Sequence, residues 1–79
     1  MTSAENRTTV VDVEGMTCGH CVEAVTRELE AVSGVTAVSV QLEAGGVSPV
    51  TVITDAPVDD GELRAAVDEA GYRVAGVRH

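Results

Sequence analysis

The apolar residues of this chain change their spacing along the sequence, and this change constrains the fold more than any other feature. Two segments carry apolar residues at the spacing of one helix face. These residues are Val22, Val25, Leu29 and Val32 in the first segment, and Leu63, Ala66, Val67 and Ala70 in the second. Four other segments alternate apolar and polar residues, as half-buried strands do, over residues 8–14, 35–42, 47–54 and 72–77.

The order strand, helix, strand, strand, helix, strand predicts an α+β fold, the ferredoxin-like βαββαβ arrangement. In this arrangement a four-stranded antiparallel sheet carries both helices on one face, and we expect the other face to be open to water. Sixteen valines against three leucines and one isoleucine favour strands over an all-helical bundle. The 79 residues are enough for one domain, for which we expect a flexible tail over residues 1–7 and a folded part over residues 8–78.

Particular residues indicate where the predicted helices begin and end. The first helix is predicted to begin near Gly19 or His20 and to stop at Gly34. For the second helix, Asp59 followed by Glu62 resembles a capping box, and Gly71 is expected to end it.

A hairpin turn is predicted at residues 44–46, between the second and third strands. Pro49 lacks an amide hydrogen, so it predicts an edge position or a bulge for the third strand. Alternation assigns to the inner face of the sheet the residues Val11, Val13, Val38, Val40, Leu42, Val50 and Val52.

The chain is strongly acidic. It has no lysine, and its thirteen Asp and Glu residues against five Arg give a net charge of -8 and a pI near 4.4. This balance excludes binding to nucleic acid or to an anionic membrane surface, because both need a cationic patch. It suits a basic or neutral protein partner or attraction for cations, although acidic side chains also keep a small protein in solution. No apolar run is long enough to span a membrane, and residues 1–9 do not resemble a signal peptide, so we expect a cytoplasmic protein.

The only cysteines, Cys18 and Cys21, have the spacing Cys-x-x-Cys. A disulfide across so short a loop would stabilise the fold little, so the pair indicates metal binding or redox chemistry in a cytoplasmic protein. The predicted start of the helix places Cys18 in the loop and Cys21 in the first turn. The positive end of the helix dipole then favours the thiolate form.

Two thiolates indicate a soft metal ion. Soft sulfur ligands select Cu(I), which is content with two of them, whereas structural zinc takes about four ligands. Only His20 and His79 could add nitrogen. His20 lies between the cysteines, and His79 at the chain end is expected to be frayed. The ligand set therefore favours copper over zinc.

The segment Gly15-Met16-Thr17-Cys18-Gly19-His20-Cys21, followed later by Gly71-Tyr72-Arg73-Val74, resembles the heavy-metal-associated domain. Within that family, and over residues 8–78, the chain resembles the bacterial cytosolic copper chaperones. The resemblance implies a carrier, not an enzyme, in which Cys18 and Cys21 bind Cu(I). It also implies delivery by ligand exchange to the metal-binding domain of a copper-exporting P-type ATPase.

The same resemblance implies that Met16 anchors the loop in the core without binding metal, and that Tyr72 packs near the metal. His20 has two interpretations. It is an exposed spacer, or it tunes the acidity of the thiols or adds a nitrogen ligand where molecules share several copper ions. Besides the ATPase domain, the partners considered are a copper-responsive regulator and a second copy of the chain linked through copper.

The chain departs from its relatives in having no lysine near the metal loop. We therefore expect carboxylates to meet a basic partner surface. The candidates are Glu14, Glu23, Asp68 and Glu69. Ser48 and Pro49 make the hairpin longer than usual, and we expect the hairpin to lie away from the metal.

Two alternatives belong to other classes of protein. Cys-Gly-His-Cys also occurs in thiol–disulfide oxidoreductases, but those have a thioredoxin-like fold of about a hundred residues, with a Trp before the motif. This chain is shorter and contains no Trp. The second alternative is a metal-binding domain of a longer transporter, with specificity for zinc or mercury.

Overall fold

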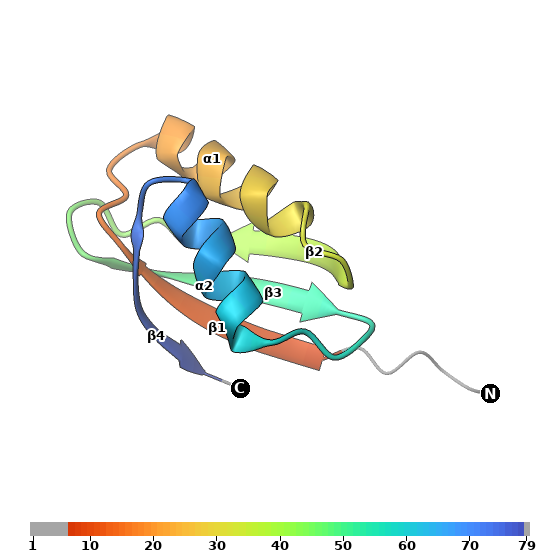
Figure 1. Cartoon of the computed structure of the whole chain (residues 1–79). Helices are drawn as coiled ribbons and strands as arrows, with labels where there is room; N and C mark the ends of the chain where they lie inside the picture. The colour runs from red at the N-terminus through yellow and green to blue at the C-terminus, as the bar shows by residue number, and fades with distance from the viewer. Residues whose placement is uncertain (1–6, 79) are drawn as a thin grey trace.

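The computed structural model describes residues 7–78 of the chain. It contains the six elements in the predicted order, namely β1 (Arg7–Glu14), α1 (Gly19–Glu30), β2 (Val35–Val40), β3 (Val47–Thr54), α2 (Asp60–Glu69) and β4 (Arg73–Arg78). The strands form one sheet in the order β2-β3-β1-β4, and all neighbours are antiparallel. Both helices cover the same face of the sheet (Figure 1). The predicted ferredoxin-like arrangement is therefore confirmed.

The two ends of the chain fall outside the described residues. Residues 1–6 and His79 lie there, so a flexible tail and a frayed end stay predictions. Arg7, which we had assigned to the tail, is the first residue of β1. Neither of the described helices has the length and apolar content needed to cross a membrane.

A core rich in valine fills the space between the helices and the sheet. The central strands β1 and β3 supply Val11, Val13, Val50 and Val52, all predicted to point inward and all fully buried. The helices add Val25, Leu29, Leu63, Ala66 and Val67. Val38 and Val40 of β2 are only half-buried against this core, because β2 lies at an edge of the sheet.

The end of α2 is formed by a glycine, as predicted. Gly71 has a φ of +92°, and its amide donates to the carbonyl of Asp68 (2.9 Å). The amide of Tyr72 donates to the carbonyl of Val67 (3.1 Å). These two bonds make a Schellman motif, which leads the chain from α2 directly into Tyr72. At the other helix, α1 ends at Glu30, and Gly34 (φ +97°) then turns the chain into β2.

The predicted capping box at the start of α2 is wrong in its side-chain part. Asp59 occupies the N-cap position, but its side chain makes no capping hydrogen bond. The turn is closed by the backbone instead, where the amide of Glu62 donates to the carbonyl of Asp59 (3.0 Å). Asp60 and Glu62 place negative charge in the first turn, which the helix dipole favours.

The prediction for Pro49 is also wrong, because β3 is an internal strand that pairs with β1 in unbroken register. The amide and carbonyl of one strand residue point to the same neighbouring strand. The Pro49 carbonyl accepts a hydrogen bond from the amide of Gln41 (3.0 Å). The Pro49 nitrogen, which carries no hydrogen, therefore also faces Gln41. Gln41 lies just beyond Val40, the last residue of β2, so the missing donor falls where this strand pair ends.

Leu42 was predicted to point inward, and this is a further error. The strand stops at Val40, and the Leu42 side chain is 37% exposed. The alternation of apolar residues continues past the last strand residue, so the pattern alone overestimates the length of β2.

Three loops meet at one end of the molecule, namely those between β1 and α1, between β2 and β3, and between α2 and β4 (Figure 1). The hairpin between β2 and β3 is bonded to the cysteine loop, because the amide of Gly45 donates to the carbonyl of Met16 (3.2 Å). The expectation that the hairpin lies away from the metal loop is therefore wrong. Strand alternation gave no information on which loops become neighbours.

The face of the sheet away from the helices is covered by no element of the described chain (Figure 1), as predicted. On this face Arg78 of β4 donates twice to the carboxylate of Asp12 on β1, through Nη2 (2.8 Å) and Nε (3.1 Å). The Arg78 side chain is 63% exposed, so solvent screening limits the contribution of this pair to about 1 kcal/mol or less.

Candidate metal centre

The two cysteines lie at the start of α1, as the sequence predicts. Cys18 is the N-cap residue in an extended conformation, and its carbonyl accepts hydrogen bonds from the amides of Cys21 (3.1 Å) and Val22 (3.3 Å). Cys21 therefore lies in the first turn. The α1 helix has no acidic side chain in that turn, so no negative charge there offsets the positive end of the helix dipole beside the thiols.

The two sulfur atoms lie close together at the surface. The Sγ atoms of Cys18 and Cys21 are 3.6 Å apart, well beyond the length of a disulfide bond, which is about 2.05 Å. Both cysteines are free; Cys18 is exposed and Cys21 is half-buried. The pair is therefore open to a ligand from outside the chain.

Hydrogen bonds lower the pKa of Cys21 from 9.0 to about 6. The largest cause is a bond from the backbone amide of Thr17, followed by a bond from the hydroxyl of Tyr72 and one from the backbone of Cys18. Partial burial acts in the opposite direction and is outweighed. The Thr17 hydroxyl also lies 3.9 Å from the Cys21 sulfur. At neutral pH, Cys21 is therefore a thiolate.

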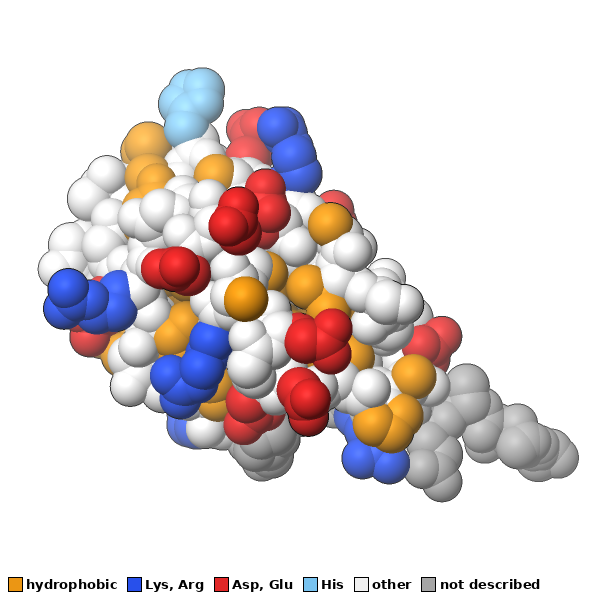
Figure 2. Space-filling view, viewed as in Figure 1, with side chains coloured by type: hydrophobic (Ala, Val, Ile, Leu, Met, Phe, Trp, Pro, Cys, Tyr) orange, Lys and Arg blue, Asp and Glu red, His pale blue; other side chains and the backbone are white. Residues whose placement is uncertain are grey.

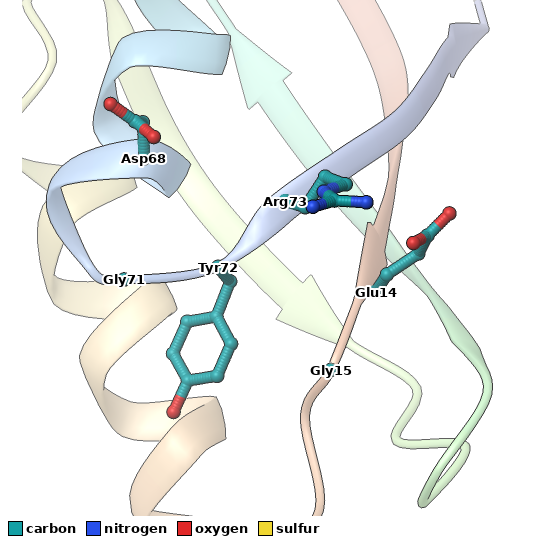
Figure 3. A pocket seen from close by; sticks show the side chains of 6 residues that line it. All are labelled: Glu14, Gly15, Asp68, Gly71, Tyr72 and Arg73. Atoms are coloured by element: carbon teal, nitrogen blue, oxygen red, sulfur yellow. The ribbon is translucent and has the colours of Figure 1, made fainter.

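Tyr72 is held beside the cysteines by the turn that follows α2. In Figure 3 its ring points from this turn toward the start of α1, away from the neighbouring Arg73 and Glu14. Its hydrogen bond to Cys21 raises the pKa of the Tyr72 hydroxyl. The ring passes close to Gly15, where a Cβ atom would lie 3.7 Å from Tyr72 Cδ1, and Gly15 has a φ of +95°. A contact at that distance would be an ordinary one, so it is the positive φ that favours glycine at position 15.

A shallow hollow opens beside Tyr72. It is lined by Glu14, Gly15, Asp68, Gly71, Tyr72 and Arg73 (Figure 3). Glu14 and Arg73 are cross-strand partners on β1 and β4. The hollow carries charges of both signs and does not include either cysteine.

The other residues singled out from the sequence occupy different environments. Met16 is fully buried in the core, beneath the loop that carries Cys18. His20 is exposed in the first turn of α1. Within residues 7–78, no group of three or more His, Cys, Asp or Glu side chains is arranged to hold a metal ion. The structure therefore brings together the two thiols and Tyr72, and it offers no third metal-binding side chain among these residues.

The carboxylates predicted to face a partner are spread over three elements. Glu23 on α1 and Asp68 and Glu69 on α2 are exposed, and Glu14 at the end of β1 is half-buried. Together the two helices carry seven acidic side chains and two arginines. Acidic side chains outnumber basic ones over the helix-bearing face in Figure 2.

Sequence reasoning missed two contributors to the site, Thr17 and Gly45. The Thr17 amide is the main cause of the lowered pKa of Cys21, and the Gly45 amide holds the carbonyl of Met16. Both act through the backbone, so residue type gave no signal for them. Their positions, in the loop before a helix and in a glycine turn, were the only available indications.

A pair of thiols at the surface, with Cys21 ionised at neutral pH, suits soft metal ions that accept two ligands. It does not complete a structural zinc site, which takes about four. The site also leaves room for a further thiolate to approach from outside the protein.

Residues 10–73 match the heavy-metal-associated domain, and the chain belongs to this family. It is similar to the copper chaperone CopZ of Staphylococcus aureus strain JH9, with 40% identity over 65 residues, covering 82% of this chain and 93% of the relative. Among solved structures it is similar to a CopZ metallochaperone, with 37% identity and a TM-score of 0.76 over 87% of this chain and 100% of the other. It also resembles the N-terminal domain of a potential copper-translocating P-type ATPase from Bacillus subtilis, solved in the Cu(I)-loaded state, with 29% identity and a TM-score of 0.70 over 94% of this chain and 92% of the other.

Proposed function

We propose that this chain is a copper chaperone of the cytoplasm that holds Cu(I) between the sulfurs of Cys18 and Cys21. The observation that carries the proposal is the pair of free thiols at the start of α1, with the two sulfurs 3.6 Å apart, Cys18 exposed and Cys21 half-buried. The relatives named as copper chaperones support the choice of metal. The family and the fold do not support a thiol–disulfide oxidoreductase, which was expected to have a thioredoxin-like fold.

Binding requires both sulfurs in the thiolate form. Cys21 is already ionised at neutral pH because hydrogen bonds lower its pKa to about 6. Any thiol that is still protonated releases its proton to solvent as it becomes a ligand. The ion keeps its +1 charge, so no oxidant or reductant takes part.

Delivery follows from the open coordination of the site. A thiolate from a docked partner adds to the ion, and one of the two original thiolates then leaves. The released thiolate is again free to take up a proton from solvent. Because Cys18 lies in an exposed loop and Cys21 in the helix, we assign the first departure to Cys18. The ion changes ligands without a large movement of the protein.

The proposed partner is the metal-binding domain of a copper-exporting P-type ATPase. The structural similarity to an N-terminal domain of such an ATPase from Bacillus subtilis supports this proposal, because two domains of the same fold would present their thiols in similar ways. We propose that the acidic surface of this chain meets a basic surface of that domain. A copper-responsive regulator and a second copy of the chain are further candidates for the same site.

Three neighbouring residues take supporting roles in this proposal. Met16 anchors the loop from below, since its side chain is fully buried and is not available as a ligand. Tyr72 stabilises the thiolate of Cys21 through its hydroxyl. His20 is an exposed spacer in the carrier that holds a single ion.

The test is a competition titration of the fully reduced chain against a Cu(I) chelator, repeated with Zn(II). We expect one tightly held Cu(I) per chain, weak zinc binding, and loss of tight copper binding in Cys18→Ser and in Cys21→Ser. His20→Ala is the matched control, because it changes the same turn without removing a sulfur, and it should bind one Cu(I) like the original. A reduced chain that yields its copper to a modest competitor, or that prefers zinc, would contradict the proposal.

A further inference from the structure

Two apolar side chains stand exposed on either side of the turn between β2 and β3. Leu42 is 37% exposed and Val47 is 44% exposed, and these are the exposed large hydrophobic side chains of residues 7–78. Residues 42–47 form the tip of this hairpin, which we call the hairpin tip. The exposed large apolar side chains of the described residues therefore flank a single turn, and apolar side chains gathered at one place on a surface are a feature of interaction sites.

The hairpin tip adjoins the cysteine loop. The amide of Gly45 donates to the carbonyl of Met16 (3.2 Å), and Met16 precedes Cys18 by two residues. Val47 is the cross-strand partner of Glu14, the last residue of β1 before the loop. Figure 1 shows the two loops side by side at the same end of the molecule. A protein that brings a thiolate to an ion held by Cys18 and Cys21 therefore also comes close to the hairpin tip.

The hairpin tip is held in one shape by internal bonds. The amide of Gly46 donates to the carbonyl of Glu43 (2.9 Å). The hydroxyl of Ser48 is buried and accepts a hydrogen bond from the amide of Glu43 (2.9 Å). Gly45 has a φ of +77°, which fits a tight turn. A surface that is already ordered loses little conformational freedom when a partner covers it.

We propose that the hairpin tip is a docking surface for the protein domain that exchanges copper with Cys18 and Cys21. This inference rests on the proposed function. The domain that fits has a thiol pair bordered by apolar side chains, which cover Leu42 and Val47. It also has a basic side chain opposite Glu43, the charged residue of the hairpin tip. Covering the tip removes water from the side of the copper site that the hairpin borders.

The experiment compares two routes by which Cu(I) leaves the loaded chain. One acceptor is the N-terminal domain of the Bacillus subtilis ATPase. The other is a small Cu(I) chelator, which takes the ion without docking on the hairpin tip. The test variant is Leu42→Ser/Val47→Ser. The matched control is Val10→Ser/Ile53→Ser, which removes two half-buried apolar side chains from the open face of the sheet. Thermal unfolding checks that each variant is folded, and the chelator titration checks its copper affinity.

We expect the test variant to transfer copper to the domain about ten-fold more slowly, corresponding to about 1.4 kcal/mol, because exposed apolar anchors at an interface each contribute modestly. Its transfer to the chelator should stay within about two-fold of the original rate, since the ligands are unchanged. The control should transfer to both acceptors at the original rates. In the original chain, the amide signals of Gly45 and Val47 should shift when the domain is added.

Three results would overturn the docking surface. The test variant could transfer to the domain at the original rate, it could slow equally toward the chelator, or the control could slow as much as the test variant. A loss of copper-dependent self-association without a change in transfer would assign the tip to a second copy of the chain, and would also overturn the proposal. If the original chain binds no Cu(I), the proposed function fails, and that result is seen in the titration before any transfer is measured.

Discussion

The Cys18→Ser variant leaves Cys21 as the only thiol of the chain, so the ionisation of Cys21 can be followed by itself. The pKa of Cys21 is lowered mainly by the backbone amide of Thr17 and next by the Tyr72 hydroxyl. The side chain of Cys18 contributes least among the groups that lower it. We therefore expect the pKa of Cys21 in this variant to stay far below 9.0.

The size of the effect decides which measurement is informative. With a pKa of about 6, about 90% of Cys21 is thiolate at pH 7, whereas a thiol with a pKa of 9.0 is about 1% thiolate. A thiolate of lower pKa is also a weaker nucleophile, by about 20-fold for a difference of this size. The net gain in alkylation rate at pH 7 is therefore only about four-fold. The midpoint of the pH profile is a much sharper readout than the rate.

The assay is the alkylation rate of the reduced variant by iodoacetamide across the pH range, checked by the ultraviolet absorbance of the thiolate. We expect a midpoint near 6 in the folded chain and near the ordinary thiol value in denaturant. Adding Tyr72→Phe should raise the midpoint, because it removes a donor to the thiolate. A folded midpoint near 9.0, or no response to Tyr72→Phe, would refute the hydrogen-bond account.

The same ionisation makes the stability of the variant depend on pH. Folding lowers the pKa of Cys21, so the folded state binds fewer protons than the unfolded state between about pH 6 and pH 9.0. The contribution to the free energy of unfolding is therefore fully present above pH 9.0 and is lost as the pH falls through about 6. Urea denaturation across this range measures it, with Cys18→Ser/Cys21→Ser as the reference that lacks the group.

Two further predictions concern stability. Met16 is fully buried, so Met16→Ala should lower the free energy of unfolding by about 2–5 kcal/mol through the cavity that it leaves. Urea denaturation of the chain without copper measures this loss. An effect below about 1 kcal/mol would mean that Met16 does not anchor the loop. Gly34 has a φ of +97°, and a Cβ atom would lie 2.9 Å from Val58 Cγ2, so Gly34→Ala should cost more than about 1 kcal/mol. Gly61→Ala in α2 is the control for Gly34→Ala, because a Cβ there meets no atom within 4 Å and should be tolerated.

Local spacing predicted the parts of the fold that depend on neighbouring residues. The start of α1 at Gly19 and the burial of Val11 and Val50 follow from periodicities of a few residues. The position of Pro49 could not be predicted in the same way, because it depends on which strands pair and in what order. Strand order is decided by contacts between segments far apart in the chain, and alternation is the same at an edge and in the centre.

The candidate site shows the same division. Cys18 and Cys21 could be proposed as ligands from their type and spacing, because soft metal chemistry needs particular side chains. The bonds from the amides of Thr17 and Gly45 could not, since every residue except proline carries an amide and only the folded loop decides where it points. The prediction about Leu42 failed for a related reason, because the strand ends before the apolar pattern does.

The strand order leaves two edge strands, β2 and β4, and each is protected in a different way against unwanted pairing with another chain. Strand β4 begins and ends with an arginine, Arg73 and Arg78, so charge discourages the addition of a further strand. Strand β2 has no charge over Val35–Val40, but Thr36 is an extra residue in its ladder and bonds through its hydroxyl to the Ile53 carbonyl (3.1 Å). Strand β4 has a similar irregularity, because Ala75 is an extra residue in its ladder with β1. The edge at β4 therefore combines charge with an irregular shape, whereas the uncharged, valine-rich edge at β2 gains its resistance to aggregation from shape alone.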